Sequence, residues 1–252
     1  MKIKFGLKLW STNTDLVNQA IQLIDDKIFD YIELFVVPAT HISPFLVDVP
    51  YIIHIPHHKF GVNIGEASKK KYNLQMINES IAWADELDAK YLILHSGYGS
   101  MEHSTDLLHE ITDNRLLIEN MPKVGLNDEQ MIGYSPEQIE ELIRNSDRGL
   151  CLDMGHAAKA AVSLEKDYRE YVKMFLRFEP KVFHMSDGML SSEKDEHLSF
   201  GEGEFDFEYL LGCVSSCRSK LITIETLRVN QHSLQEHVQN VDFLKNSINI
   251  IK

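Results

Sequence analysis

Short apolar runs recur along the chain, and a polar cluster follows each of them. The runs cover residues 2–10, 31–37, 51–56, 91–97, 115–121, 149–154, 181–186 and 221–227. Runs of this length that are rich in Ile, Leu, Val and Phe are typical of strands buried on both faces of a sheet. The pattern therefore predicts eight buried strands.

Apolar residues at helical spacing mark most of the segments between the runs. Leu16, Ala20 and Leu23, for example, share one face of a predicted helix. The predicted helices cover residues 13–27, 66–88, 135–144, 164–178, 206–219 and 232–248. Two connections, residues 38–50 and 101–114, look short.

Eight strands that alternate with helices predict an α/β protein, a single-domain (β/α)8 TIM barrel over residues 1–252. A doubly wound open sheet is the alternative. Such a sheet rarely carries eight of these units, and it usually has a glycine-rich phosphate turn after its first strand. The segment "LWSTNTD" (residues 9–15) has no glycine, which favours the barrel.

Polar side chains stand at the ends of six successive predicted strands. In a barrel of this kind, the active site lies at the carboxyl ends of the strands, so these side chains should converge on one mouth. An unpaired charge at a buried strand end is costly, and packing alone does not explain the pattern. The candidates are His57, His95, Glu119, Asp153, His156, His184, Asp195, His197 and Glu225.

Histidine and carboxylate are the ligands that zinc and similar divalent ions prefer. Nine candidates exceed the needs of one tetrahedral site, which takes about four ligands. The set suits a cluster of two or three ions bridged by carboxylates and water. Sites with several metal ions typically serve phosphoester hydrolysis, in which one ion activates water and others hold the phosphate oxygens.

Composition limits the partners and the compartment. The formal net charge of −13 argues against a large nucleic-acid footprint, although carboxylates that bind metal are counted here as bare negative charges. No apolar run approaches the ~20 residues of a membrane-spanning helix. The three cysteines form no paired framework, as expected in a reducing cytoplasm. We expect a cytoplasmic protein without a membrane association, and no protein partner is evident.

Seven segments, taken together and in order, resemble the endonuclease IV family (AP endonuclease family 2) within the xylose isomerase-like barrels. They are "PHHKFGVNIG" (56–65), "LILHSG" (92–97), "LIENM" (117–121), "CLDMGHA" (151–157), "FHMSD" (183–187), "DEHLSFGEG" (195–203) and "ITIETL" (222–227). The resemblance implies that all nine candidates bind three zinc ions, with Mn2+ or Mg2+ as alternatives. It also implies a DNA-repair hydrolase that cuts DNA on the 5′ side of an abasic site, with Glu119 and Glu225 as the catalytic residues that bridge or orient metals and water.

The regions that grip DNA in that family differ in this chain. The family uses an arginine-bearing loop after strand two and an aromatic–aliphatic pair after strand three. Here residues 36–45 contain no arginine, and Phe60 is followed by Gly61. The metal chemistry therefore transfers better than the DNA substrate does.

Four further residues complete the predicted site. Phe60 and His58 are candidate substrate contacts. Asn120 and Asp187 are candidates for orienting the ligands by hydrogen bonds, with ordinary loop capping as the alternative.

Sugar isomerases and epimerases of the same superfamily keep one metal, held by the equivalents of Glu119, Asp153, His184 and Glu225. Their two glutamates move a proton beside a carbonyl. A single-metal enzyme acting on a small sugar is therefore the alternative function. Such an enzyme has no evident need for the remaining histidines and Asp195, which favours hydrolysis. A barrel that binds a ligand without turnover is a third possibility, and the intact ligand positions count against it.

Overall fold

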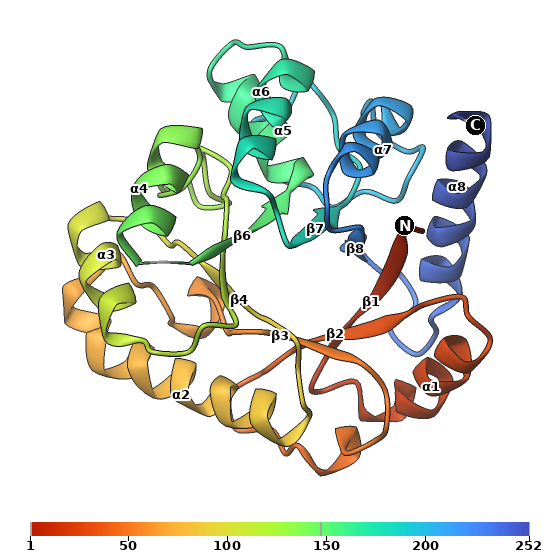
Figure 1. The fold of residues 1–252 in the computed structure, drawn as a ribbon, viewed down its shortest axis with the longest axis horizontal. Coiled ribbons are helices and arrows are strands. Elements are labelled where there is room, and N and C mark those ends of the chain that lie inside the picture. Colours follow the sequence, from red (N-terminus) through yellow and green to blue (C-terminus); the bar gives the residue numbers. More distant parts are fainter. Residues whose placement is uncertain (1, 147, 252) are drawn as a thin grey trace.

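The computed structural model describes residues 2–146 and 148–251, and its strands form a closed parallel barrel (Figure 1). The strands are β1 Lys4–Trp10, β2 Tyr31–Phe35, β3 Tyr51–His54, β4 Leu92–His95, β5 Leu116–Glu119, β6 Gly149–Asp153, β7 Val182–Met185 and β8 Leu221–Ile224. Each strand pairs with its neighbours in sequence, and β1 also pairs with β8 from Lys4↔Leu221 to Leu7↔Ile224. The (β/α)8 barrel is thereby confirmed, and the open doubly wound sheet is excluded.

Helices surround the barrel as an outer ring (Figure 1). They are α1 Val17–Asp25, α2 Lys70–Glu86, α3 Met101–Glu110, α4 Pro136–Ser146, α5 Met154–Ser163, α6 Tyr168–Phe175, α7 Phe207–Ser216 and α8 Gln235–Ile251. Their apolar faces and the outward faces of the strands form one large core. Within the described residues, no helix has both the length and the apolar character needed to cross a membrane.

The two connections that looked short differ in the structure. Residues 38–50 contain only a single 3-10 turn, Ser43–Phe45, as the sequence predicted. The prediction for residues 101–114 was wrong, because they contain α3. The hydroxyl of Ser100 caps this helix by accepting a hydrogen bond from the His103 N–H.

Helix α5 was also not predicted. It begins at Met154, directly after the last residue of β6. Asp153 ends the strand and caps the helix at the same time, because its Oδ1 accepts a 2.7 Å hydrogen bond from the His156 N–H. No turn residue separates the two elements, so the capping signal of Asp153 lies inside the apolar run and was interpreted as the end of the strand.

Inward-facing side chains fill the barrel in two layers. The lower layer is mainly apolar and includes Tyr31, Ile52, Ile93, Leu117, Cys151 and Val182, with Thr223 as a polar member that is hydrogen-bonded to Tyr31. Because side chains alternate along a strand, the residue two positions further on faces inward again, nearer the carboxyl end. These upper positions are all polar: Lys8, Glu33, His54, His95, Glu119, Asp153, His184 and Glu225. The register of the strands thus gathers the charged groups at one end of the barrel.

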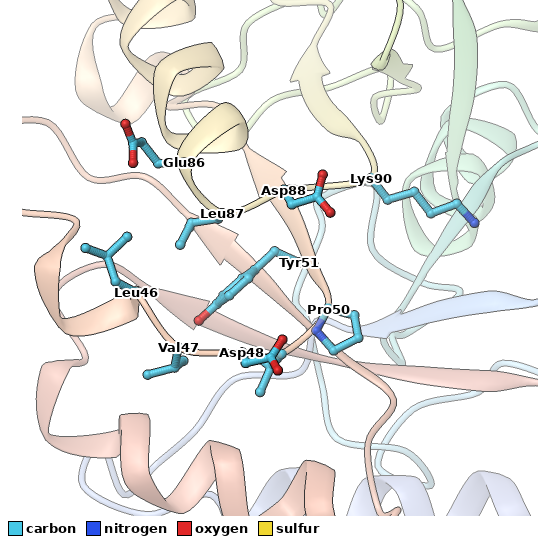
Figure 2. Close-up of a pocket in the computed structure, with 10 residues that line it drawn as sticks. Leu46, Val47, Asp48, Pro50, Tyr51, Glu86, Leu87, Asp88 and Lys90 are labelled. Atoms are coloured by element: carbon cyan, nitrogen blue, oxygen red, sulfur yellow. The ribbon is translucent and has the colours of Figure 1, made fainter.

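A surface pocket of about 590 Å³ lies at the opposite end (Figure 2). Its lining runs from Leu46 to Tyr51 before β3 and from Glu86 to Lys90 before β4. It opens beside the connection that carries only a 3-10 turn. It contains none of the residues of the predicted site.

Candidate metal centre

Glu119, at the end of β5, lies at the middle of the polar layer and is fully buried. Its Oε2 is 3.2 Å from His54 Nε2 and 3.1 Å from His95 Nε2. Its Oε1 is 3.3 Å from His184 Nδ1 and 3.4 Å from His156 Nδ1. Burial disfavours its charge, but His95 and His184 hold the pKa of Glu119 well below its usual range. One carboxylate therefore joins four histidine rings.

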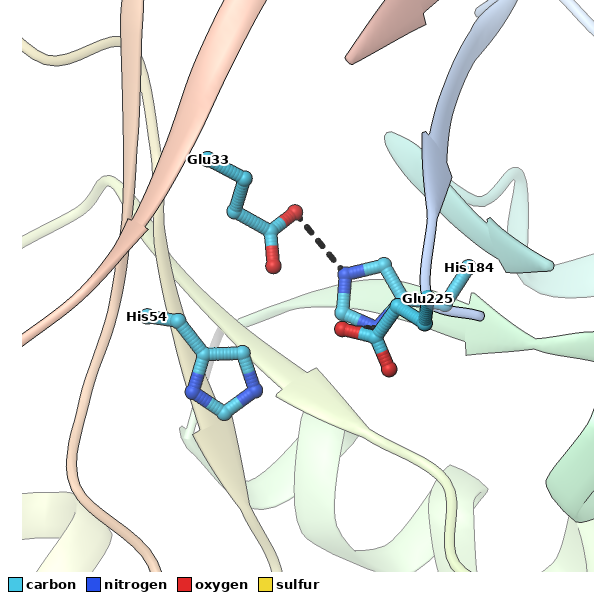
Figure 3. Close-up of side chains that lie close together, drawn as sticks. All are labelled: Glu33, His54, His184 and Glu225. Carbon is cyan, nitrogen blue, oxygen red and sulfur yellow. Dashed lines mark hydrogen bonds and ion pairs between the residues drawn. The ribbon is translucent and has the colours of Figure 1, made fainter. Parts of the chain in front are cut away.

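His184 is held in one orientation by the carboxylates around it. Its Nε2 donates a 2.9 Å hydrogen bond to Glu33 Oε2 (Figure 3). Its Nδ1 lies 3.2 Å from Glu225 Oε1. The ammonium of Lys8 bridges Glu33 and Glu225 from below. This arrangement fixes the ring and directs Nδ1 at the carboxylates of Glu119 and Glu225, as a metal-binding histidine requires.

Asn120 brackets Asp153 with its side-chain amide. Its Oδ1 accepts from the Asp153 N–H and its Nδ2 donates to the Asp153 carbonyl, each at 2.8 Å. The Asn120 carbonyl accepts a 2.9 Å hydrogen bond from His156 Nδ1, which turns His156 Nε2 toward Asp195. Burial raises the pKa of Asp153 to about 6.

A second set of ligand-type groups joins α5 to the long loop between β7 and α7. His156 Nε2 lies 3.5 Å from Asp195 Oδ2, and His197 Nε2 lies 2.6 Å from the same oxygen. Burial disfavours the charged His197 ring, but Asp195 outweighs this and raises the pKa of His197 to about 9. His197 has a φ of 50°, an uncommon conformation for a residue with a side chain.

The remaining predicted residues line one side of the mouth. The ring of His57 stacks on that of His95 with 5.0 Å between centroids. The ring centroid of Phe60 lies 5.9 Å from that of His57 and 5.8 Å from that of Trp10. The ring centroids of His58 and His57 are 5.0 Å apart. An aromatic wall therefore flanks the charged groups.

Asp187 shapes the loop that follows β7. Its carboxylate accepts hydrogen bonds of 2.8 to 3.2 Å from backbone N–H groups. The donors belong to Gly188, Gly201, Gly203 and Phe205. Asp187 thus folds the segment that carries Asp195 and His197 back onto the end of the strand.

Ligand-type atoms gather closely enough to hold metal ions. Within each of four sets, the atoms lie within 4.8 Å of one another. The sets are Glu119–Asp153–His184–Glu225, His54–His95–Glu119, His156–Asp195–His197 and Glu33–His54–His184–Glu225. The donor types fit zinc, and the buried Nδ1 atoms of His95 and His197 have no hydrogen-bond partner among the described residues. His57 belongs to none of these sets among the residues that the structure describes.

Lys8, Glu33 and His54 were not among the predicted site residues. Each is a polar residue inside an apolar run. Glu33 and His54 stand two positions after lower-layer residues, and Lys8 stands two positions after Gly6. A charge within a run buried on both faces needs a partner, and that was the available signal. The sequence analysis considered the ends of the runs and so overlooked Lys8 and Glu33.

Comparisons with known proteins identify the fold family of the chain. A model of the family described as "Xylose isomerase-like TIM barrel" matches residues 42–247. A probable endonuclease 4 of Mycoplasmopsis synoviae (strain 53) is 32% identical over 183 residues, which are 65% of this chain and 64% of that protein. The chain thus spans less than two thirds of that relative's length.

Two solved structures share the fold. A D-tagatose 3-epimerase-like protein has a TM-score of 0.76 at 22% identity and covers 99% of this chain and 98% of its own. Endonuclease IV from Thermus thermophilus has a TM-score of 0.73 at 20% identity, with 98% and 99% covered. Identities this low show a common architecture, and the chemistry has to be argued from the side chains.

Proposed function

The chain belongs to the xylose isomerase-like TIM barrel family, and from this premise we propose that it is an endonuclease IV-like, metal-dependent phosphoester hydrolase. We expect the enzyme to bind several metal ions at one site, and we expect these to be three zinc ions. The nine ligands are the predicted set from His57 to Glu225, and Glu119 and Glu225 are the catalytic carboxylates.

The set His156–Asp195–His197 carries the proposal. One ion needs about four ligands. These are already available from Glu119, Asp153, His184 and Glu225. A second complete set beside them has no task in a single-metal enzyme. Its carboxylate and two imidazoles offer ligand atoms within 4.8 Å of one another, a spacing that could hold one further ion.

The protein's own residues would hold the substrate and the charges in place. When bound, the ions would activate water and neutralise the charge of the phosphate. Glu119 ties the histidines of several strands to one point, and Asn120 keeps Asp153 directed into the mouth. Lys8 holds Glu225 by an ion pair. Phe60 and His58, on the aromatic side, would contact the leaving or retained group of the substrate.

The substrate class is a phosphodiester, with abasic DNA as one candidate. Gly61 has a φ of 85°, and a Cβ at this position would lie 3.2 Å from the Tyr72 ring. The backbone therefore disfavours an aliphatic side chain after Phe60. Together with the arginine-free segment 36–45 and the net charge of −13, this favours a phosphodiester that needs few contacts to a duplex backbone.

A single-metal epimerase or isomerase acting on a small sugar is the second candidate. Glu119, Asp153, His184 and Glu225 form a self-contained set, which supports it. Such an enzyme would exchange a substrate C–H proton with solvent. A hydrolase would not.

The deciding experiment is the metal content per chain, measured by elemental analysis of protein purified without chelator, together with hydrolysis of bis(4-nitrophenyl) phosphate. We expect about three zinc ions. We also expect His95→Ala and Asp195→Ala to lower the hydrolysis rate at least ~100-fold. His41→Ala, an exposed histidine outside the site, is the matched control.

A single ion per chain, especially manganese or magnesium, would contradict the proposal. A wild-type hydrolysis rate in Asp195→Ala would also contradict the proposed multinuclear site, because a single-metal site does not need that residue. Solvent exchange into sugar substrates would then be measured next.

A further inference from the structure

The loop over residues 188–205 carries Asp195 and His197, whereas His156 stands on α5. The set His156–Asp195–His197 therefore exists only while this loop lies against that helix. Little regular structure holds the loop, apart from the bridge between Asp187 and Leu198. The hydrogen bonds to Asp187 anchor the base of the loop and residues 201–205, and the Leu227 N–H donates to the His197 carbonyl. None of these contacts reaches α5, where His156 stands.

Lys159 lies one turn after His156 on α5, and its side chain is fully buried. Its Nζ forms a 2.6 Å ion pair with Glu196 Oε2. It also donates to the carbonyls of Met189 and Ser192, at 2.6 and 3.2 Å. All of these partners belong to the loop.

The contacts form a two-point attachment. Asp195 and Glu196 are neighbours in the loop, and they meet His156 and Lys159, which are three residues apart on one face of α5. Glu196 Oε2 also accepts a 2.8 Å hydrogen bond from the Met189 N–H, which closes the loop on itself.

The surroundings of Lys159 offer no other reason for a lysine. Its neighbours on α5 are buried alanines at 157, 158, 160 and 161. A buried ammonium is unfavourable unless it is paired and hydrogen-bonded, and here the loop supplies its hydrogen-bond and ion-pair partners. The φ of 50° at His197 also requires a loop that is held firmly.

We propose that Lys159, acting through Glu196, is the positioning residue that holds Asp195 and His197 over His156 and so sets the affinity of that set for its metal ion. The proposal rests on the proposed function, since it takes this set to be a metal site. It assigns to the Lys159–Glu196 pair a task that lies outside the ligands themselves.

The test is a Co2+ titration of the metal-free protein, because the visible absorption of Co2+ reports the coordination of each site. In Lys159→Met, we expect the ion at the set His156–Asp195–His197 to bind about 10- to 100-fold more weakly. Loss of a residue that orients a metal ligand typically lowers metal affinity by this factor. Binding at the Glu119 set should be unchanged. Glu196→Gln should give a smaller effect of the same kind, and it protects the test if Lys159→Met folds poorly. Lys173→Met, exposed on the adjacent α6, is the matched control.

A readout without metal separates this proposal from the proposed function. Amide hydrogen exchange of the metal-free protein should become faster at Met189 and along residues 189–198 in Lys159→Met, but not in Lys173→Met. Unchanged exchange, or equal weakening of every ion, overturns the positioning role alone. Faster exchange in a protein whose wild type binds a single ion supports the attachment of the loop and overturns the multinuclear hydrolase.

Discussion

Lys8 places a positive charge among the buried carboxylates of the barrel. Burial opposes its charge, but Glu225 and Glu33 raise the pKa of Lys8 above its usual value. The ammonium therefore stays charged and compensates two carboxylates that would otherwise repel each other. We therefore expect the stability of this buried carboxylate pair to depend on the side chain of Lys8.

We expect Lys8→Met to lower the free energy of unfolding of the metal-free protein by about 3–5 kcal/mol, because Glu33 and Glu225 lose their shared partner. Zinc should restore part of the loss, since divalent ions neutralise the same carboxylates. Urea denaturation with and without zinc measures both effects. Lys71→Met, exposed on α2, should change little. A loss that zinc does not reduce would count against a metal site at Glu225.

The histidines of the mouth predict a pH dependence for the metal-free protein. The pKa of His197 in the folded state is about 9, above its ordinary value of 6.5, because Asp195 outweighs the effect of burial. A raised pKa contributes stability that is full below pH 6.5 and is lost as the pH rises through 9. His156 and His184 are shifted in the same direction.

The melting temperature of the metal-free protein should therefore fall by several degrees between about pH 7 and pH 9. The zinc-loaded protein should lack this fall, because the metal replaces the protons on these groups. Differential scanning calorimetry in chelator and in zinc measures the contrast. Parallel curves for the two forms would show that His197 does not meet the metal.

The site residues differ in how far the sequence could predict them. Those at the ends of apolar runs, such as Glu119 and Asp153, were visible because a barrel directs all strand ends to one mouth. Glu33 was not, because its partners Lys8 and His184 are distant in sequence and only the closed barrel brings them together. The pattern of apolar and polar residues along the chain does not show which distant residues pair in the folded barrel.

At the scale of single elements, the side chain of Tyr31 in β2 lies against the backbone of β1 at Gly6. A Cβ at this position would lie 2.2 Å from the ring of Tyr31, which is buried and bonded to Thr223. The Tyr31 ring of β2 therefore fits in this position only because residue 6 of β1 is a glycine.

We expect Gly6→Ala to lower the free energy of unfolding by about 1–3 kcal/mol, because the buried Tyr31 ring has to move. Gly212→Ala is the matched control, since no atom lies within 4 Å of a Cβ there and the residue is inside α7. It should instead raise stability by about 0.5–1 kcal/mol. Thermal or urea unfolding compares the two, and equal effects would refute the close approach.

Helices α3 and α5 show where prediction of elements from sequence fails. Neither has apolar residues along a single face: the buried positions of α3 are Ser104, Leu107 and Leu108, and α5 is buried at every position from Met154 to Ala161. The long helices, such as α2, were predicted because their apolar spacing extends over several turns. Tertiary packing rather than a local pattern therefore decides α3 and α5.

For the whole molecule, the net charge of −13 predicts weak attraction to nucleic acid. We expect hydrolysis of a small phosphodiester to change less than ~3-fold between about 50 and 200 mM salt, a range in which a protein with many phosphate contacts loses ~1,000-fold or more in DNA affinity. Fluorescence anisotropy with a short duplex, repeated across this range, gives the comparison. Tight duplex binding with a steep salt dependence would contradict the expectation.

The closure of the barrel by β1 and β8 also governs how the molecule comes into being. During synthesis, β1 waits for a partner about 200 residues away, so the growing chain holds an open arc with two unpaired strand edges. Glu225, which follows β8, reaches Lys8 only when that arc closes. Until β8 pairs with β1, we expect these exposed edges to favour self-association of the unfinished chain.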